Sequence, residues 1–167
     1  MAHYCLICGS QLQTKWIENR EREFCSVCGW INYEQLKVSA GCRIELEGKL
    51  LLVQRKNPPF KETWHFPSGY VEVDEYPPHA AERETLEECG LVVSANYLAG
   101  AYFYDDDPRG SGVVLMYSAT INGGELSLSD ETLAVKFFMP DELPALPLAG
   151  MSALASIQDW LAEKKNG

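Results

Sequence analysis

One segment of the chain, Gly69–Leu91, carries far more negative charge than its own residues can balance. It contains a single full cation, Arg83, against seven carboxylates. The acidic residues are Glu72, Asp74, Glu75, Glu82, Glu84, Glu87 and Glu88. Any fold of this chain must place these like charges where solvent or a bound cation offsets their repulsion.

Helical spacing begins after Pro77-Pro78 and stops at Gly90, a natural C-terminal cap, so we expect a helix over residues 77–89. Helix geometry puts three of the glutamates on one arc about 100° wide, namely Glu84, Glu87 and Glu88. Their repulsion destabilises the helix by a few tenths of a kcal/mol per pair. The helix dipole disfavours Glu87 and Glu88 near the C-terminus by roughly 0.3–1 kcal/mol. Several carboxylate oxygens suit Mg²⁺ or Mn²⁺. We therefore expect a divalent-metal site here, with a solvated acidic face as the alternative.

Size and composition indicate one ordinary domain with a small appendage, since the chain has 167 residues and is 46% hydrophobic. No apolar run approaches the roughly 18 residues of a membrane span, and the first residues do not resemble a signal peptide. We expect a cytoplasmic protein with no membrane partner. The net charge of −10 argues against a nucleic-acid partner, which would need a basic surface. An anionic substrate would need metal ions to bridge it to so acidic a protein.

Four of the six cysteines form two pairs with the spacing of metal ligands. The pairs are Cys5-x-x-Cys8 and Cys25-x-x-Cys28, each followed by glycine. Because disulfides are unfavourable in a reducing cytosol, this pattern predicts one tetrahedral Zn²⁺ held by all four thiolates, and therefore structural. Redox pairs or unliganded thiols are the alternative. Cys42 and Cys89 have no such spacing, and we expect them to be buried.

We divide the chain near residue 37. Residues 1–37 are too short to fold on core burial alone and form the predicted zinc ribbon. Residues 38–167 have the pattern of an α/β domain. The expected elements are a hairpin of strands 37–46 and 49–55 around Glu47-Gly48, a strand or two strands joined near Asn96 over residues 91–104, strands 113–121 and 133–139, and a helix over 151–165.

The acidic segment resembles the full Nudix box of the Nudix hydrolases over its 23 residues. Gly69 is followed after five residues by Glu75, and after seven more by Arg83-Glu84-Thr85-Leu86-Glu87-Glu88-Cys89-Gly90-Leu91. One departure is Thr85, where the family more often has an aliphatic residue. The residues from Trp64 to Ser68 resemble the Trp/Pro/Gly stretch that precedes the box. The resemblance implies the Nudix α/β/α sandwich, with a mixed sheet.

The resemblance also implies roles for individual residues. The Gly69 carbonyl and the carboxylates of Glu84, Glu87 and Glu88 would bind the catalytic cations. Arg83 and Glu75 would form an ion pair that holds the loop against the helix. The general base could be Glu87 or Glu88, or Glu131 from a later loop, for which an exposed turn acid is the alternative.

A zinc ribbon joined to a Nudix domain resembles the NADH pyrophosphatases and a related group of ADP-ribose or FAD pyrophosphatases. The NADH group carries Ser-Gln-Pro-Trp-Pro-Phe-Pro after the box, where this chain has YLAGAYFYDDDPRGSG. The second group is more similar, including the Gly41-Cys42 strand and the late FF…DELP stretch. Family likeness also makes a homodimer possible.

We therefore expect Mg²⁺-dependent hydrolysis of an ADP-linked dinucleotide, of the ADP-ribose or FAD type, to AMP and a phosphorylated product. The alternatives are a broad nucleotide-sugar or nucleoside triphosphate pyrophosphatase, a catalytically weak Nudix domain that senses a nucleotide, and an RNA-binding or decapping protein. The last conflicts with the acidic composition. No single aromatic residue and no histidine receives a role from its pattern. The aromatic candidates for stacking on adenine are Trp64, Tyr70, Tyr102, Phe103 and Tyr104.

Overall fold

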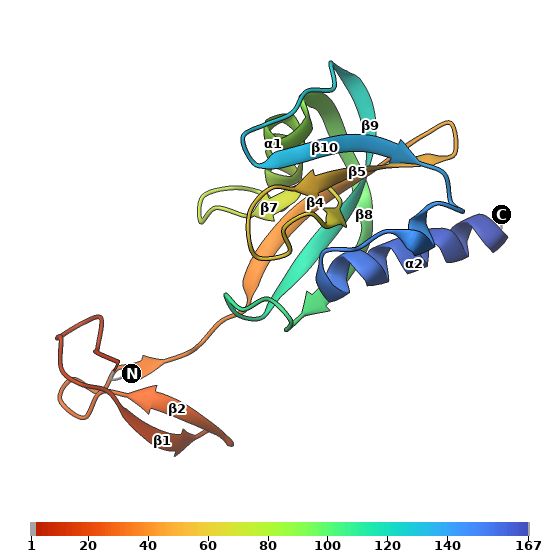
Figure 1. The fold of residues 1–167 in the computed structure, drawn as a ribbon. Coiled ribbons are helices and arrows are strands. Elements are labelled where there is room, and N and C mark those ends of the chain that lie inside the picture. The colour runs from red at the N-terminus through yellow and green to blue at the C-terminus, as the bar shows by residue number, and fades with distance from the viewer. Residues whose placement is uncertain (1–2, 167) are drawn as a thin grey trace. The chain divides into compact units, whose positions relative to one another are not determined.

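The computed structural model describes residues 3–166 of the chain (Figure 1). It divides into two compact units, Met1–Gln35 and Leu36–Gly167.

The first unit is a three-stranded antiparallel sheet in the order β1-β2-β3. Its strands are β1 (Gln13–Ile17), β2 (Arg20–Phe24) and β3 (Ile31–Asn32). Glu18 and Asn19 form the β1–β2 turn with positive φ angles of 51° and 60°, as a two-residue hairpin loop requires. Among the described residues of this unit, only Cys5 and Cys25 are buried, at 3% and 0% exposure. The unit therefore has no aliphatic core of its own.

A mixed sheet in the order β10-β5-β4-β9-β8 forms the second unit, with β6 beside β5 and β7 beside β4. Its strands are β4 (Lys37–Leu46), β5 (Lys49–Arg55), β6 (Trp64–His65), β7 (Ser68–Tyr70), β8 (Leu91–Tyr104), β9 (Gly112–Gly124) and β10 (Thr132–Phe138). The predicted hairpin is present, because Glu47 and Gly48 turn between β4 and β5 with positive φ. The β4–β9 pair is parallel and the others are antiparallel, so the sheet is mixed as expected.

Strands β4 and β5 pair only beside their turn, at Glu45–Leu50 and Leu46–Lys49. Farther from the turn, β7 pairs with β4 and β6 pairs with β5. Gly41 lies directly opposite Ser68, and a Cβ on Gly41 would come within 2.5 Å of the Ser68 Cβ. The divergence of β4 and β5 thus places the residues before and at Gly69 inside the sheet.

Residues 91–104 form the single strand β8, which is the first of the two expected alternatives. The pairing with β9 shifts register between Ala95 and Tyr97, which makes Asn96 a β-bulge. A bulge keeps the ladder continuous on both sides of one extra residue, and for this reason the polar break at Asn96 bends the strand without ending it.

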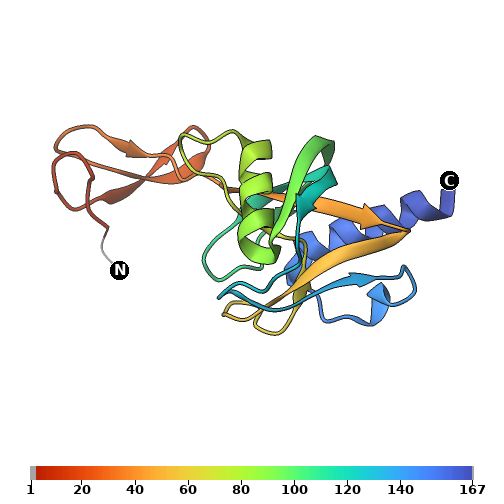
Figure 2. The same ribbon diagram turned by 90° about the horizontal axis from the view of Figure 1, so that it is seen from above.

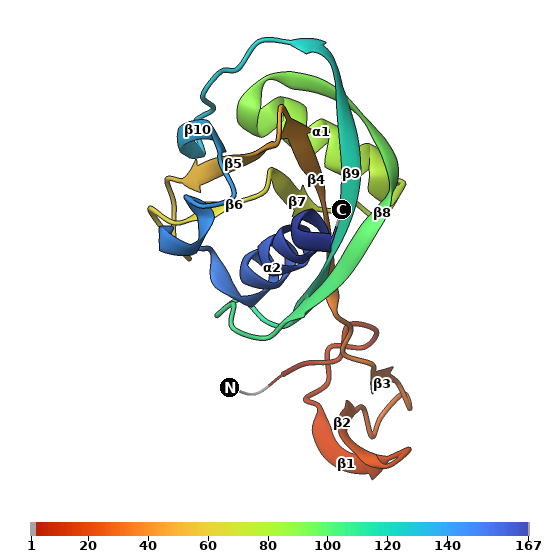
Figure 3. The same ribbon diagram turned by 90° about the vertical axis from the view of Figure 1, so that its right-hand side faces the viewer.

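The two helices, α1 (Pro77–Cys89) and α2 (Gly150–Asn166), cover opposite faces of the sheet, and a short 3₁₀ turn, η1 (Leu143–Ala145), precedes α2 (Figures 2 and 3). Side chains of β5 alternate between the two sides, as strand geometry requires. Leu51 and Val53 pack in one core with residues of α1, while Leu50 and Leu52 pack in the other with Trp160 of α2. This is the expected α/β/α sandwich. Within the described residues, neither helix has the length and apolar character that a membrane span requires.

Helix α1 begins and ends as predicted. Prolines occupy its first turn, and Gly90 caps its C-terminus at a φ of 77° while donating its N–H to the Leu86 carbonyl. Thr85 is fully buried in the face that meets the sheet, together with Cys89. Cys42 is also fully buried, as we expected for both unpaired cysteines.

Candidate active site and zinc site

Arg83 of α1 joins the acidic helix to the loop before it. Its Nε and Nη2 donate to the two carboxylate oxygens of Glu75 at 2.9 and 2.8 Å. Nη2 also donates to the Tyr70 carbonyl at 3.1 Å. These hydrogen bonds from Arg83 lower the pKa of Glu75. The loop that carries Gly69 is therefore fixed to α1 by a bidentate ion pair.

The same guanidinium also contacts two glutamates of α1. Nη1 of Arg83 donates to Glu84 at 2.7 Å and to Glu87 at 3.1 Å. One cation thus offsets part of the repulsion that the sequence places on this helix. Among the described residues, the one group of three or more potential metal ligands whose ligand atoms lie within 4.8 Å of one another is the set of four cysteines. The carboxylate oxygens of the glutamates on α1 are farther apart than this.

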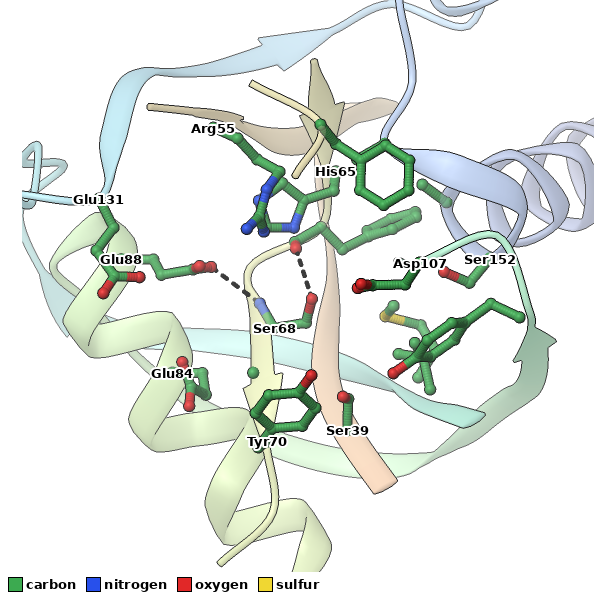
Figure 4. Close-up of a pocket in the computed structure, with 18 of the residues that line it drawn as sticks. Ser39, Arg55, His65, Ser68, Tyr70, Glu84, Glu88, Asp107, Glu131 and Ser152 are labelled. Atoms are coloured by element: carbon green, nitrogen blue, oxygen red, sulfur yellow. Dashed lines mark hydrogen bonds between the residues drawn. The ribbon is translucent and has the colours of Figure 1, made fainter. Parts of the chain in front are cut away.

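Glu88 lies deepest of the three glutamates on the arc, at 6% exposure. It accepts the Ser68 backbone N–H at 2.9 Å, which ties α1 to β7 (Figure 4). Burial, and to a smaller extent the nearby carboxylates of Glu84 and Glu131, raise the pKa of Glu88 to about 8. Burial also raises the pKa of Glu84. Buried carboxylates with this preference for a proton are suited to a hard divalent cation, which would stabilise their charged form.

Gly69 lies directly against the carboxylate of Glu84. A Cβ at this position would be 2.1 Å from the Glu84 Cδ, closer than any real contact. Because β7 pairs with β4 at this point, the backbone cannot move away easily. Glycine at this position therefore lets main-chain atoms approach the acidic face of α1.

Glu131 comes from the loop before β10 and reaches the same place. Its carbonyl accepts the Lys56 N–H at 2.9 Å, which fixes this loop to the end of β5. Its side chain lies beside Glu88 in the pocket (Figure 4). Glu131 is exposed and also lines the pocket, so the general base and the exposed turn acid both stay open as interpretations of this residue.

A pocket of about 500 Å³ extends from the glutamates to the other side of the sheet. This volume is in the range of natural cofactor and nucleotide sites. Glu84, Glu88 and Glu131 lie on one side of it, and Asp107 and Ser152 lie on the other (Figure 4). Apolar lining comes from Val114, Met116 and Tyr104, which pack in the same core as residues of α2. The pocket therefore combines an acidic end with an amphipathic end.

The far end is shaped by the loop after β8. Asp107 forms a bidentate ion pair with Arg109, with an Nη2–Oδ2 distance of 2.6 Å. The Lys37 ammonium donates to the Arg109 carbonyl. Asp106 accepts the Met151 N–H at 2.8 Å, which fixes the loop to the start of α2. These contacts hold the DDDPRG segment as a wall of the pocket.

Two of the five aromatic candidates, Tyr70 and Tyr104, line this pocket. Trp64 instead packs edge-on against Phe138, with ring centroids 4.7 Å apart. Tyr102 is buried and donates its hydroxyl to Asp159 at 3.0 Å. The sequence around one aromatic residue therefore does not predict whether its ring lines the pocket or packs in the core. That depends on the strands beside it.

Sequence reasoning missed several charged or polar residues that line the pocket, among them Arg55, His65, Asp107 and Arg109. A signal for Arg55 was available. Arg55 follows Leu51 and Val53 at the two-residue period of a strand, so it belongs on their face, which is the α1 face. No comparable local signal marks His65 or the Asp107–Arg109 pair.

The four cysteines of the first unit meet at one point. Sγ of Cys5 lies 3.6 Å from that of Cys28, and Sγ of Cys8 lies 3.4 Å from that of Cys25. A tetrahedral Zn²⁺ with bonds of about 2.3 Å separates its sulfur ligands by about 3.8 Å, close to these distances. The chain turns after each pair at Gly9 and Gly29, with φ of 71° and 79°. The four thiols therefore match the donor set and spacing of a structural zinc site.

Comparison with known proteins matches two family models to successive parts of the chain. A family model of the NUDIX domain matches residues 35–161, and a zinc-ribbon model described as Nudix N-terminal matches residues 3–34. The sandwich and its glutamate-bearing helix belong to the class of hydrolases that act on phosphoric anhydrides. The chain is a member of the Nudix hydrolase family, with the family's N-terminal zinc ribbon.

Named relatives and solved structures are similar over most of the chain. An ADP-ribose pyrophosphatase from Methanocaldococcus jannaschii is 36% identical over 74% of this chain and 72% of that protein. The NAD-capped RNA hydrolase NudC of Escherichia coli is 27% identical over 95% of this chain, which spans only 60% of NudC. The crystal structure of a NUDIX hydrolase from Nitrosomonas europaea is 28% identical and covers 98% of this chain and 93% of its own, with a TM-score of 0.80.

Proposed function

We propose that this protein is a Mg²⁺-dependent pyrophosphatase that splits the diphosphate of an ADP-linked dinucleotide into AMP and a phosphorylated product. The observation that carries the proposal is the pocket itself. Its acidic end holds Glu84 and Glu88 beside Gly69, and its amphipathic end has room for a nucleoside. The relative from M. jannaschii, named as an ADP-ribose pyrophosphatase, supports ADP-ribose as the first substrate to test.

In this proposal Glu84, Glu87, Glu88 and the Gly69 carbonyl hold Mg²⁺ or Mn²⁺. When bound, such a cation neutralises phosphate charge and lowers the pKa of a coordinated water. Arg83 and Glu75 keep the Gly69 loop at the helix through their bidentate contact. The proton of the attacking water passes to a carboxylate, for which Glu88, Glu87 and Glu131 are the candidates.

Other dinucleotides stay in consideration as substrates. NudC is named for NAD-capped RNA, so NAD-linked substrates are the second candidate. The net charge of −10 disfavours the RNA part of such a substrate, which the protein would repel. FAD, nucleotide sugars and nucleoside triphosphates also carry a phosphoric anhydride linked to a nucleoside and are further candidates.

A product-resolved hydrolysis panel with Mg²⁺ in ¹⁸O-labelled water tests this proposal. The substrates are ADP-ribose, FAD, NAD, NADH, a nucleotide sugar, a nucleoside triphosphate and a short NAD-capped RNA. Glu88→Gln is assayed beside Glu125→Gln, a control that removes an exposed carboxylate outside the pocket. We expect AMP from ADP-ribose, a loss of at least about a hundredfold in Glu88→Gln and no change in the control. Tight dinucleotide binding without turnover would instead support a nucleotide sensor.

A further inference from the structure

The loop that joins β9 to β10 contacts the C-terminal end of α1. The last carbonyls of a helix have no partner within the helix, so they need donors from other parts of the chain. This loop supplies two of them. The Ser127 N–H donates to the Cys89 carbonyl at 3.0 Å. The Thr132 hydroxyl donates to the Glu88 carbonyl at 3.3 Å. The loop is therefore joined to the last turn of the helix that carries the glutamates.

Thr132 connects this helix end to the main chain of Glu131. Its side chain is buried, at 5% exposure, and its hydroxyl oxygen also accepts the Ser129 N–H at 2.9 Å. The Ser129 hydroxyl in turn accepts the Glu131 N–H at 3.1 Å. On the other side, the Glu131 carbonyl accepts the Lys56 N–H at 2.9 Å. Two hydroxyls thus fix the main chain of Glu131 to α1, while one backbone contact fixes it to the end of β5.

The side chain of Glu131 has less support than its main chain. It is exposed, and no ion pair within residues 3–166 involves it. Its carboxylate nevertheless lies beside Glu88 in the pocket, on the same side as Glu84 (Figure 4). Like charges repel, so neighbouring carboxylates do not hold it there. The contacts of the turn beneath it determine where this charge lies.

We propose that Thr132 is a positioning residue, whose buried hydroxyl fastens the loop before β10 to α1 and so holds the Glu131 carboxylate at the acidic end of the pocket. This inference rests on the proposed function, in which that carboxylate is a candidate to take the proton of the attacking water. A group that acts on a reacting atom must be held within about 0.5 Å of its productive position. Thr132 does not itself line the described pocket, so it acts through its neighbours.

A double-mutant cycle with ADP-ribose and Mg²⁺ tests the coupling between Thr132 and Glu131. Valine keeps the shape of Thr132 and removes only the hydroxyl. We expect Thr132→Val to lower kcat about tenfold with less than about a twofold change in KM, because the carboxylate is misplaced while the rest of the pocket is intact. Glu131→Gln should lower kcat at least as much, and the double variant should be no slower than Glu131→Gln alone.

Two further variants serve as rescue and control for the cycle. Thr132→Ser keeps the hydroxyl and should restore most of kcat. Thr14→Val makes the same chemical change at an exposed residue of β1 and should leave kcat unchanged. Losses that multiply in the double variant, or a wild-type kcat in Thr132→Val, would overturn the proposal. If Thr132→Val does not fold, Ser129→Ala replaces it in the cycle, because it removes the acceptor of the Glu131 N–H.

Mn²⁺ binding, measured by electron paramagnetic resonance, separates this inference from the proposed function because it needs no turnover. A carboxylate held beside Glu88 increases the attraction for a divalent cation. We expect Thr132→Val and Glu131→Gln each to weaken Mn²⁺ binding about three- to tenfold, again without adding in the double variant. This pattern without hydrolysis of any dinucleotide would refute the function and leave the positioning role standing. Turnover with equal kcat and equal Mn²⁺ affinity in wild type and Thr132→Val would refute the positioning role and leave the function standing.

Discussion

At the scale of single residues, burial gives His65 a measurable effect on stability. The pKa of a free histidine near 6.5 falls to about 3 at this site. Its stabilising contribution is therefore fully present above pH 6.5 and is lost as the pH falls toward 3, because the unfolded chain takes up a proton that the folded chain refuses. We expect this residue alone to lower the free energy of unfolding by about 2 kcal/mol between pH 8 and pH 5.

Urea unfolding at a series of pH values measures this effect. Carboxylates also titrate in acid, so the informative quantity is the difference between wild type and His65→Gln as the pH is lowered. Below pH 6.5 the wild type should lose free energy of unfolding faster than His65→Gln, so any stability advantage of the wild type over the variant should shrink. His79→Gln, which replaces an exposed histidine of α1, should follow the wild-type curve. Parallel curves for wild type and His65→Gln would show that the imidazole takes up protons freely in the folded state.

Gly69 illustrates a second constraint on a single residue. An added Cβ would collide with the Glu84 carboxylate at 2.1 Å, although the backbone of Gly69 does not have a positive φ. We therefore expect Gly69→Ala to displace Glu84 and lower kcat about a hundredfold, while overpacking lowers stability by about 1–3 kcal/mol. Hydrolysis assays and thermal melts check both effects. Gly123→Ala, where a Cβ meets open space, is the control and should leave activity unchanged.

At the scale of secondary-structure elements, α2 is held to the sheet by charged contacts as well as by its apolar face. Arg43 of β4 is 6% exposed and donates to both Glu163 carboxylate oxygens at 2.9 Å. Glu163→Gln leaves the buried guanidinium without a counter-charge. Because Glu163 itself is half exposed, we expect a loss of about 1–2 kcal/mol in the free energy of unfolding, below the value for a fully buried pair.

Chemical unfolding followed by helical circular dichroism measures this loss. Lys165→Gln changes one charge in the same helical turn, on an exposed residue without an ion pair among the described residues. It should have almost no effect. A gain in stability for Lys165→Gln as large as the loss for Glu163→Gln would mean that net helix charge, and not the Arg43 contact, determines the stability of α2.

Elements with strong local signals could be predicted from the sequence. The Glu47-Gly48 turn and the ends of α1 depend on residues a few positions apart, so their boundaries follow from turn and capping chemistry. The number of strands in residues 91–104 did not follow in the same way. Whether a polar residue such as Asn96 ends a strand or bulges out of it depends on the partner β9, which lies in a different part of the sequence.

The pocket shows the same distinction. Its glutamates belong to one continuous helix, so the sequence places them together without knowledge of the fold. Arg55, His65 and Asp107 come from three separate segments, which only the diverging strands and the loop after β8 bring to one place.

The environment of Thr85 could be predicted only in part from the sequence. Its methyl packs at an aliphatic position, while its hydroxyl is satisfied by the Ala81 carbonyl at 2.7 Å.

At the scale of the whole molecule, the two units depend on different sources of stability. Residues 36–166 bury two apolar clusters on the two faces of one sheet. The first unit, within its described residues, buries only Cys5 and Cys25. A segment of this size without an aliphatic core needs a covalent or metal link to stay folded. We therefore expect zinc to determine the folding of the first unit and to matter little for the second.

Removal of zinc tests this division. A strong chelator should release one zinc per chain, measured by mass spectrometry of the metal, and should make residues 3–34 sensitive to protease while the fragment from about residue 36 onward survives. Cys28→Ser should reproduce the effect without chelator, and Ser26→Ala, two residues away and not a ligand, should not. The melting transition of the second unit should move by less than about 2 °C in each case. A zinc-free preparation with a protease-resistant first unit would show that the four thiols stabilise the ribbon without a metal, and a large shift of the second transition would show that the units fold as one.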